Sequence, residues 1–299
     1  MAIDGTTLTG IFPPVTTPFA DDGAVDLAGL RRNMQGYAAA PLAGYVALGS
    51  NGEFPHLSRA EKERVIAAVV EEAAGRPVLA QVGESGLRET VALAQRAAEL
   101  GASAVMAVTP HYYRAAMTEA ALADFYDGLA DESPVPVLLY SIPQNTGVSV
   151  SPALVERCAA HPRIIGVKDS SGNLGQLAEM VERAPEGWGV LNGSSSTMVA
   201  SFAVGAPGAV LAAADFLPFE VGELWALCRD GAWDRAREAE RRLRPVLRTA
   251  SRMGVAGVKL AMDLMGYRGG LPRRPVQPVP VAGRDELVGA LRAAGLIRF

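Results

Sequence analysis

Eight short apolar runs recur along the first three quarters of the chain, and each ends in small or polar residues. The runs are continuous rather than alternating in polarity, which is typical of strands buried on both faces of a parallel sheet. Their spacing of about 20 to 35 residues is the length of a βα unit. The runs are Ile11–Thr17, Gly44–Ser50, Val78–Gly83, Ala104–Pro110, Val135–Pro143, Ile164–Ser170, Trp188–Ser194 and Gly208–Ala213.

Helix signals separate most of these runs. Ser58 and Glu61 have the spacing of a capping box ahead of an amphipathic run that stops at Gly75. Ser151 followed by Pro152 places a cap residue before a proline at the first helical position. Because strand and helix signals alternate without interruption, the sequence predicts an α/β fold of the (β/α)8 TIM barrel type. No Gly-x-Gly-x-x-Gly pattern follows the first strand, which argues against an open dinucleotide-binding sheet.

The strand signals stop after about Asp230. Helical patterns then cover Trp233–Arg252, Val255–Met265 and Arg284–Leu296, and a proline-rich link separates the last two. We therefore expect a barrel domain over residues 1–229 and a C-terminal helical extension over residues 230–299, packed on the barrel.

Charge and composition exclude several partners. The formal net charge is −4, the isoelectric point is about 5.5, and no long block of like charge occurs, so neither nucleic acid nor an anionic membrane is an expected partner. The basic run Arg241–Arg244 fits a solvated helix face. Cys158 and Cys228 lie in helical patterns, which indicates reduced thiols rather than a disulfide or metal site. The sequence shows no signal peptide and no membrane-spanning run, so we expect a cytoplasmic protein.

The chain contains three lysines against twenty-five arginines, so each lysine is a candidate for chemistry that arginine cannot perform. Lys168 ends the apolar run that begins at Ile164, where desolvation favours the neutral, nucleophilic amine. A structural ion pair is the alternative for Lys168, although Asp169 should face the opposite side of the strand. Lys62 lies in a charged helical turn and is expected at the surface, whereas Lys259 is expected to have a packing or helix-end role.

Other strand ends supply possible partners for Lys168, because the active sites of barrels lie at the carboxyl ends of the strands. Tyr140 ends the preceding strand and could move protons beside the lysine, although an ordinary core tyrosine is the alternative. Ser50 and Asn51 lie in a tight turn that could hold a carboxylate through hydroxyl and backbone donors. The three histidines are scattered, so no metal site is expected.

Four motifs occur in order at these strand ends: GSNGE at 49–53, VTPHYY at 108–113, LYSIPQNTG at 139–147 and GVKDSSGN at 166–173. Together they resemble the dihydrodipicolinate synthase / N-acetylneuraminate lyase superfamily, and the resemblance extends over essentially the whole chain. It implies a class I enzyme that forms a Schiff base with pyruvate or another 2-oxoacid and needs no metal or cofactor. It also implies a homotetramer assembled as a dimer of dimers.

The resemblance also assigns roles to particular residues. Lys168 corresponds to the Schiff-base lysine, Tyr140 to the proton-relay tyrosine, and Tyr112 to a tyrosine that reaches the neighbouring subunit's site. Ser50 and Asn51 correspond to the pair that binds the carboxylate of the 2-oxoacid, with Ser50 also in the relay, and Gly193 and Val210 to positions that line the pyruvate pocket.

The loop after the fifth strand bears on the substrate. Asn145 occupies the position where dihydrodipicolinate synthases usually carry an arginine that grips aspartate semialdehyde, although Arg114 could compensate. The motifs are closest to the 4-hydroxy-2-oxoglutarate aldolase branch, in which Ser170 would help to hold the glyoxylate end. Cleavage of 4-hydroxy-2-oxoglutarate or a similar 4-hydroxy-2-oxoacid is therefore the expected reaction. Dihydrodipicolinate synthesis, a sugar-acid dehydratase or aldolase, and a non-catalytic 2-oxoacid sensor remain alternatives.

Overall fold

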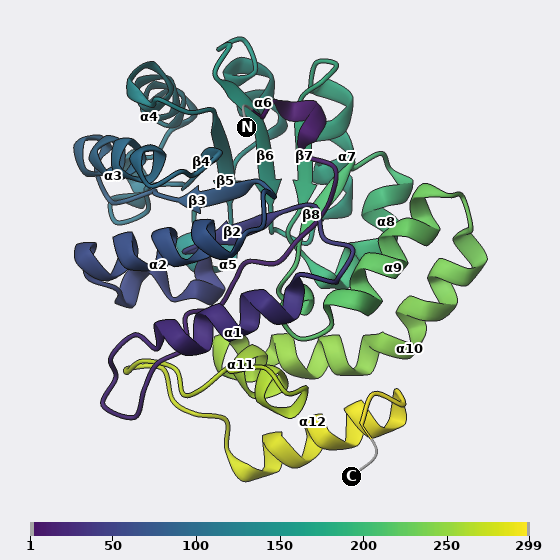
Figure 1. Cartoon of the computed structure of the whole chain (residues 1–299). Helices are drawn as coiled ribbons and strands as arrows, with labels where there is room; N and C mark the ends of the chain where they lie inside the picture. The colour runs from purple at the N-terminus through teal and green to yellow at the C-terminus, as the bar shows by residue number, and fades with distance from the viewer. Residues whose placement is uncertain (1–2, 298–299) are drawn as a thin grey trace.

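The eight predicted strands are all present in the computed structural model, which describes residues 3–297. Neighbouring strands in the ladder are parallel, in the order β1-β8-β7-β6-β5-β4-β3-β2 (Figure 1). The strands are β1 (Gly10–Phe12), β2 (Tyr45–Ala47), β3 (Val78–Gln81), β4 (Ala104–Val108), β5 (Val137–Ser141), β6 (Ile164–Asp169), β7 (Gly189–Asn192) and β8 (Gly208–Val210).

Backbone hydrogen bonds also connect the two end strands of this order, β1 and β2. The Ala43 N–H donates to the carbonyl of Ile11 at 2.8 Å, and the Val46 N–H donates to the carbonyl of Pro13 at 2.9 Å. The sheet is therefore a barrel, and the prediction of a (β/α)8 TIM barrel is confirmed.

The strands end earlier than the apolar runs predict. The first run was expected to continue to Thr17, but β1 ends at Phe12, before Pro13 and Pro14, which have no N–H to donate to a ladder. Residues beyond the strand ends form the loops at one end of the barrel, and these loops hold most of the candidate site residues.

Twelve α-helices occur within residues 3–297. They are α1 (Leu27–Tyr37), α2 (Arg59–Glu72), α3 (Leu87–Glu99), α4 (Glu119–Glu132), α5 (Pro143–Thr146), α6 (Pro152–Cys158), α7 (Leu174–Arg183), α8 (Met198–Ala203), α9 (Pro218–Arg229), α10 (Trp233–Arg252), α11 (Gly254–Leu264) and α12 (Val281–Ala293). The predicted capping box is confirmed, because Ser58 Oγ accepts from the Glu61 N–H and the Glu61 carboxylate accepts from the Ser58 N–H. Ser151 likewise caps α6 ahead of Pro152.

Two apolar layers hold the barrel together. One lies between the sheet and the surrounding helices, and the other fills the barrel interior with side chains such as Phe12, Val46 and Leu138. Leu8 closes the interior at the amino ends of the strands, where its side chain packs against Gly166 and Gly189. A Cβ at Gly189 would lie 2.6 Å from a methyl carbon of Leu8, so these strands need glycine to admit the leucine.

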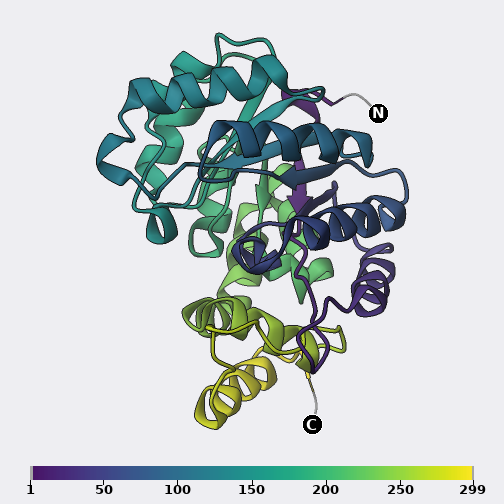
Figure 2. The same cartoon turned by 90° about the vertical axis from the view of Figure 1, so that its left-hand side faces the viewer.

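The helices α10, α11 and α12 follow the last barrel helix. Figures 1 and 2 show α11 and α12 together at one end of the molecule, below the barrel in both views. The helix α10 spans the predicted residues, while α11 and α12 each begin slightly earlier than predicted, α12 directly after Pro280. The predicted boundary between residues 229 and 230 falls between α9 and α10, and the division into two domains stays a prediction. The outer ends of the two predicted domains, residues 1–2 and 298–299, lie outside the described residues.

No helix within residues 3–297 is long and apolar enough to cross a membrane. Cys158 and Cys228 are free and buried, at the ends of α6 and α9. Burial raises the pKa of the Cys158 thiol to about 12 and that of the Cys228 thiol to about 11, so both thiols are protonated and unreactive at neutral pH.

Candidate active site

Lys168 and Tyr140 are neighbours in the barrel because they are directly paired in the register of β5 and β6. Both side chains are almost completely buried, and both point into the barrel interior. The Lys168 Nζ lies 4.1 Å from the centroid of the Tyr140 ring, over its face. The adjacency expected from the sequence is therefore confirmed, and the contact is of the cation–π kind when the amine is charged.

The amine of Lys168 makes no hydrogen bond or ion pair with any residue in the range 3–297. Asp169 faces away, as predicted: its carboxylate accepts a hydrogen bond of 2.5 Å from Ser171 Oγ. Burial raises the pKa of Asp169, and the hydrogen bonds from Ser171 oppose that rise. The alternative of a structural ion pair at Lys168 is therefore wrong, and the amine faces the cavity.

The turn after β2 brings a hydroxyl to the tyrosine. This short 3₁₀ turn, η2 (Ser50–Gly52), places Ser50 Oγ 3.1 Å from the Tyr140 hydroxyl, and either oxygen can donate. Asn51 lies beside Ser50 in the same turn and also lines the cavity. The Tyr140 and Ser50 hydroxyls thus form a hydrogen-bonded pair that can pass a proton from one oxygen to the other, and the Lys168 amine lies over the ring of the same tyrosine.

These side chains line a cavity of about 360 Å³ at the carboxyl ends of the strands. Lys168 is the only charged residue that lines it within the described part of the chain. The other predicted site residues found there are Ser50, Asn51, Tyr140, Asn145, Ser170, Gly193 and Val210. The helices α10 and α11 supply one wall through Ser251, Gly254, Val255 and Val258, which the sequence did not predict as site residues.

Asn145 faces the cavity from α5, next to Gln144. Gln144 is held by a hydrogen bond of 2.7 Å from its side-chain amide to the carbonyl of Ser170. Arg114, which could have compensated for the missing arginine, does not line this cavity. Its side chain lies instead against Gly147, where an added Cβ would lie 2.7 Å from a guanidinium nitrogen.

Tyr112 is the predicted site residue that the fold does not bring into its own chain's cavity. It lies in the loop after β4, and 77% of its surface is exposed. Its ring makes an edge contact with the exposed ring of Tyr113, at 5.0 Å between centroids. The role predicted for Tyr112 requires a neighbouring subunit, and so it stays a prediction.

A second cavity, of about 330 Å³, shares Ser50, Tyr140 and Asn145 with the first, and its lining corrects one prediction. Lys62 lines it and is buried, although the sequence placed this lysine at the surface. Its Nζ forms an ion pair of 2.6 Å with Glu84 and lies 3.6 Å from the centroid of the Phe54 ring. The surface prediction failed because Lys62 shares the inward face of α2 with Val65 and Ile66, three and four residues later.

Asp215, just after β8, was not singled out from the sequence. Its side chain is fully buried, and neither carboxylate oxygen has a hydrogen-bond partner among residues 3–297. Burial raises the pKa of Asp215 well above its ordinary value of 3.8, and the charge of Lys168 opposes that rise. The folded protein therefore favours the neutral acid more strongly than the unfolded chain does, so an ionised Asp215 costs the folded protein free energy.

The stability of an Asp215→Asn variant relative to the unmodified protein is expected to increase as the pH rises. When the pKa of a carboxyl group is higher in the folded protein than in the unfolded chain, its contribution to the free energy of unfolding is largest at pH values below the unfolded-state pKa. Between the unfolded-state pKa and the folded-state pKa, the free energy of unfolding falls by about 1.4 kcal/mol per pH unit. Asparagine has the same shape and does not titrate. Urea unfolding of both proteins at pH 5, 6.5 and 8 should show a difference that widens with pH, whereas a constant difference would contradict the neutral-acid assignment.

Within residues 3–297, no three His, Cys, Asp or Glu side chains are placed to hold a metal ion. The chemistry that the cavity itself offers is that of an amine beside two hydroxyl groups. Such an arrangement suits covalent capture of a carbonyl compound followed by proton transfer.

Comparison with known proteins shows which family contains this chain. The dihydrodipicolinate synthetase family model matches residues 7–294. A 4-hydroxy-tetrahydrodipicolinate synthase from Methanothrix thermoacetophila is 34% identical over 272 residues, which cover 90% of this chain and 91% of the relative. A protein of the same name from Maridesulfovibrio salexigens is 31% identical over 97% of this chain and 100% of its own length.

Solved structures agree with the sequence relatives. The dihydrodipicolinate synthase of Thermotoga maritima superposes with a TM-score of 0.92 at 26% identity, covering 97% of this chain and 99% of the other. YagE, a prophage protein of the dihydrodipicolinic acid synthase family from Escherichia coli K12 solved with pyruvate, superposes with a TM-score of 0.90 at 29% identity, covering 97% and 99%. The similarity supports an enzyme, and the chain belongs to the dihydrodipicolinate synthetase family.

Proposed function

We propose that the protein is a class I, pyruvate-handling aldolase that cleaves 4-hydroxy-2-oxoglutarate or a similar 4-hydroxy-2-oxoacid. Lys168 is the Schiff-base nucleophile. The free, buried amine beside Tyr140 supports this role, and so does the pyruvate bound by the structurally similar YagE. A binding protein for 2-oxoacids would not need a nucleophilic amine next to a proton-transfer group.

The proposed reaction begins when the neutral amine of Lys168 attacks C2 of the oxoacid. Loss of water gives an iminium, which accepts the electron pair of the C3–C4 bond as that bond breaks. Tyr140 takes the proton of the C4 hydroxyl, with Ser50 passing it on, so that C4 leaves as an aldehyde. Protonation of the enamine at C3 and hydrolysis then release pyruvate and restore the lysine.

The substrate carboxylates are assigned to different parts of the cavity. The turn that contains Ser50 and Asn51 holds the C1 carboxylate through hydroxyl and backbone donors. Ser170 faces the aldehyde end, where it would contact glyoxylate. These contacts use the residues at hand and place no metal or cofactor in the reaction.

The observation that carries the choice of substrate is Asn145 in a cavity where, among residues 3–297, Lys168 is the only charged lining residue. A neutral amide cannot supply the bidentate charged contact that an arginine gives to the carboxylate of aspartate semialdehyde. Arg114 does not line the cavity, so within this chain it does not replace that contact.

The rival proposal is 4-hydroxy-tetrahydrodipicolinate synthase, which keeps the same Schiff base but condenses pyruvate with aspartate semialdehyde. The names of the relatives that are 31% to 34% identical favour it. A sugar-acid dehydratase or aldolase of the same family would also use Lys168 and differ in the aldehyde end alone.

A substrate panel separates these proposals. We expect pyruvate release from 4-hydroxy-2-oxoglutarate to exceed release from longer 4-hydroxy-2-oxoacids and to exceed condensation of pyruvate with aspartate semialdehyde. The kcat/KM for each substrate is the measurement. Turnover of aspartate semialdehyde alone would show that the Asn145 argument is wrong, and preference for a sugar acid would favour the third proposal.

We further propose a homotetramer, a dimer of dimers, in which Tyr112 completes the proton relay of the adjacent subunit. Its exposed ring suits such a role. Replacing Tyr112 with phenylalanine should lower kcat about 10- to 100-fold while leaving KM nearly unchanged, because it removes one relay hydroxyl. Tyr113→Phe is the matched control and should stay within about twofold. Equal effects of the two substitutions would contradict the proposed relay.

A further inference from the structure

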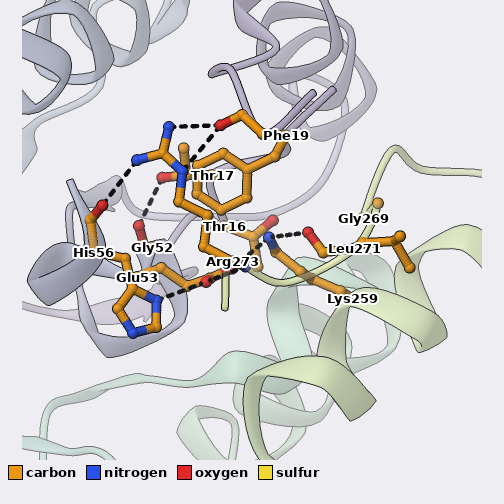
Figure 3. Close-up of polar contacts among 12 residues, drawn as sticks. Thr16, Thr17, Phe19, Gly52, Glu53, His56, Lys259, Gly269, Leu271 and Arg273 are labelled. Carbon is orange, nitrogen blue, oxygen red and sulfur yellow. Dashed lines mark hydrogen bonds and ion pairs between the residues drawn. The ribbon is translucent and has the colours of Figure 1, made fainter. Parts of the chain in front are cut away.

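Glu53 directly follows the Ser50–Gly52 turn and is held in an unusual environment. Its backbone is left-handed, at φ 55° and ψ 37°, and its N–H donates to the carbonyl of Ser50 at 3.2 Å. Its side chain is buried, and three donors surround the carboxylate (Figure 3). They are the ammonium of Lys259 in an ion pair, the backbone N–H of Arg273 at 2.9 Å and His56 Nδ1 at 3.0 Å.

Lys259 reaches this carboxylate from α11. Its side chain is fully buried, its Nζ donates to the carbonyl of Leu271 at 3.2 Å, and it lies 4.2 Å from the centroid of the Phe19 ring. Burial lowers the pKa of Lys259, while the charge of Glu53 opposes that lowering. Because it is paired and enclosed, Lys259 is not a competing nucleophile for Lys168.

The same helix lines the substrate cavity. Val255 and Val258 of α11 face the cavity, and Lys259 follows Val258 directly. Two further hydrogen bonds fix this region: Thr17 Oγ1 donates to the carbonyl of Gly52 at 2.7 Å, and Thr16 Oγ1 donates to Met262 Sδ at 3.0 Å. The helix α11 and the turn therefore form one packed unit around the buried ion pair.

A buried ion pair is a poor source of stability, because desolvation offsets most of the attraction between the charges. Its contribution is orientation: a carboxylate held by one ion pair and two hydrogen bonds fixes the position of the residue that carries it. Here that residue ends the turn whose Ser50 and Asn51 face the cavity.

We propose that Glu53 and Lys259 are positioning residues for substrate binding: they hold the Ser50–Gly52 turn in the conformation that receives the C1 carboxylate of the 2-oxoacid. The helix α11, which follows the barrel, therefore contributes to the function of the site as well as lining its cavity. The inference rests on the proposed function, since it takes pyruvate as the compound bound at Lys168.

The test compares Glu53→Gln, Lys259→Met and the double variant with the unmodified protein. Borohydride reduction with peptide mass mapping measures the fraction of Lys168 that is trapped at increasing concentrations of pyruvate. Acetaldehyde is the second probe, because it has a carbonyl group and no carboxylate. Arg252→Gln, which breaks the exposed pair with Glu286 between α10 and α12, is the matched control.

We expect each single substitution to raise the half-saturating pyruvate concentration by about tenfold or more, because it displaces the turn that contacts the pyruvate carboxylate. Trapping by acetaldehyde should change by less than about twofold, and the Arg252→Gln control should match the unmodified protein. The double variant buries no lone charge, so its thermal midpoint should recover relative to the single variants, while its half-saturating pyruvate concentration stays high.

Three results would overturn the inference. One is an unchanged half-saturating concentration in variants that remain folded. Another is an equal loss of trapping with pyruvate and with acetaldehyde, which is what a merely structural pair predicts. The third is recovery of pyruvate affinity together with stability in the double variant. If the unmodified protein does not trap pyruvate at Lys168, the proposed function fails as well.

Discussion

Replacing Lys168 with arginine is expected to lower pyruvate release by at least about 10⁴-fold, the scale seen when a covalent nucleophile is removed. Arginine stays protonated at any working pH and cannot form the Schiff base. Arginine is also a long side chain with a nitrogen-containing end group, so the loss reflects the missing amine. Steady-state assay with the best substrate of the panel measures the effect.

Lys62→Arg is the matched control for this substitution. Lys62 is the other lysine that lines a cavity next to Tyr140, but it is held in an ion pair with Glu84 and does not line the active-site cavity. Its replacement should change kcat by no more than a few-fold. A Lys168→Arg variant that retains more than about one hundredth of the activity would contradict covalent catalysis at this residue.

Replacing Gly193 with alanine is the second substitution with a large expected effect. A Cβ at this position would lie 2.0 Å from Ser170 Oγ and 3.0 Å from Lys168 Cε. Because β6 and β7 are fixed by the ladder, the two side chains must move to make room. Displacement of a catalytic group by about 1 Å can cost about 100-fold, so kcat/KM should fall by at least that factor.

Gly175→Ala is the matched control for Gly193→Ala. Gly175 is an exposed residue of α7, and an added Cβ would meet nothing closer than 3.5 Å. Activity should therefore stay within about twofold, and stability should be unchanged or slightly raised. Circular dichroism and the thermal midpoint establish that the Gly193→Ala variant is folded; full activity in a folded variant would show that Ser170 and Lys168 tolerate the shift.

The strand ends made much of the site predictable. In a parallel barrel, all carboxyl ends of the strands meet at one rim, so residues that end different apolar runs must lie near one another. Lys168 and Tyr140 end consecutive runs and are accordingly paired in register. The turn at Ser50 follows the same rule, because it comes directly after β2.

The helical wall and the buried charges could not be found in this way. Lys259 and Glu53 are far apart in the sequence, and their contact depends on how α11 docks against the turn. No local pattern encodes that docking. Asp215 follows a strand as many polar residues do, and its enclosure depends on distant segments, including Tyr37, whose hydroxyl donates to the Asp215 carbonyl at 2.8 Å.

The wrong surface prediction for Lys62 has a different cause, because the sequence did contain a signal for burial. The charged neighbours of Lys62 suggested the surface, yet the helical period places it on the same face as apolar residues at i+3 and i+4. Charge density along the sequence does not reveal which face of an amphipathic helix a residue occupies. The helical periodicity of the apolar residues around Lys62 indicates that this lysine is buried.

The role predicted for Tyr112 cannot be read from the structure of a single chain. The sequence resemblance assigned it a role in a neighbouring subunit, and its exposed position in the loop after β4 places it outside its own cavity. A side chain that acts in a neighbouring subunit does not need to be buried in its own chain. Its contribution therefore depends on assembly, which the Tyr112→Phe variant and its Tyr113→Phe control address.

Borohydride reduction of the unmodified protein in the presence of pyruvate, followed by peptide mass mapping, tests the Schiff-base role of Lys168 directly. We predict a reduced pyruvyl adduct on Lys168, with Lys62 and Lys259 unmodified because both are buried in ion pairs. No adduct, or an adduct on Lys259 in place of Lys168, would contradict that role.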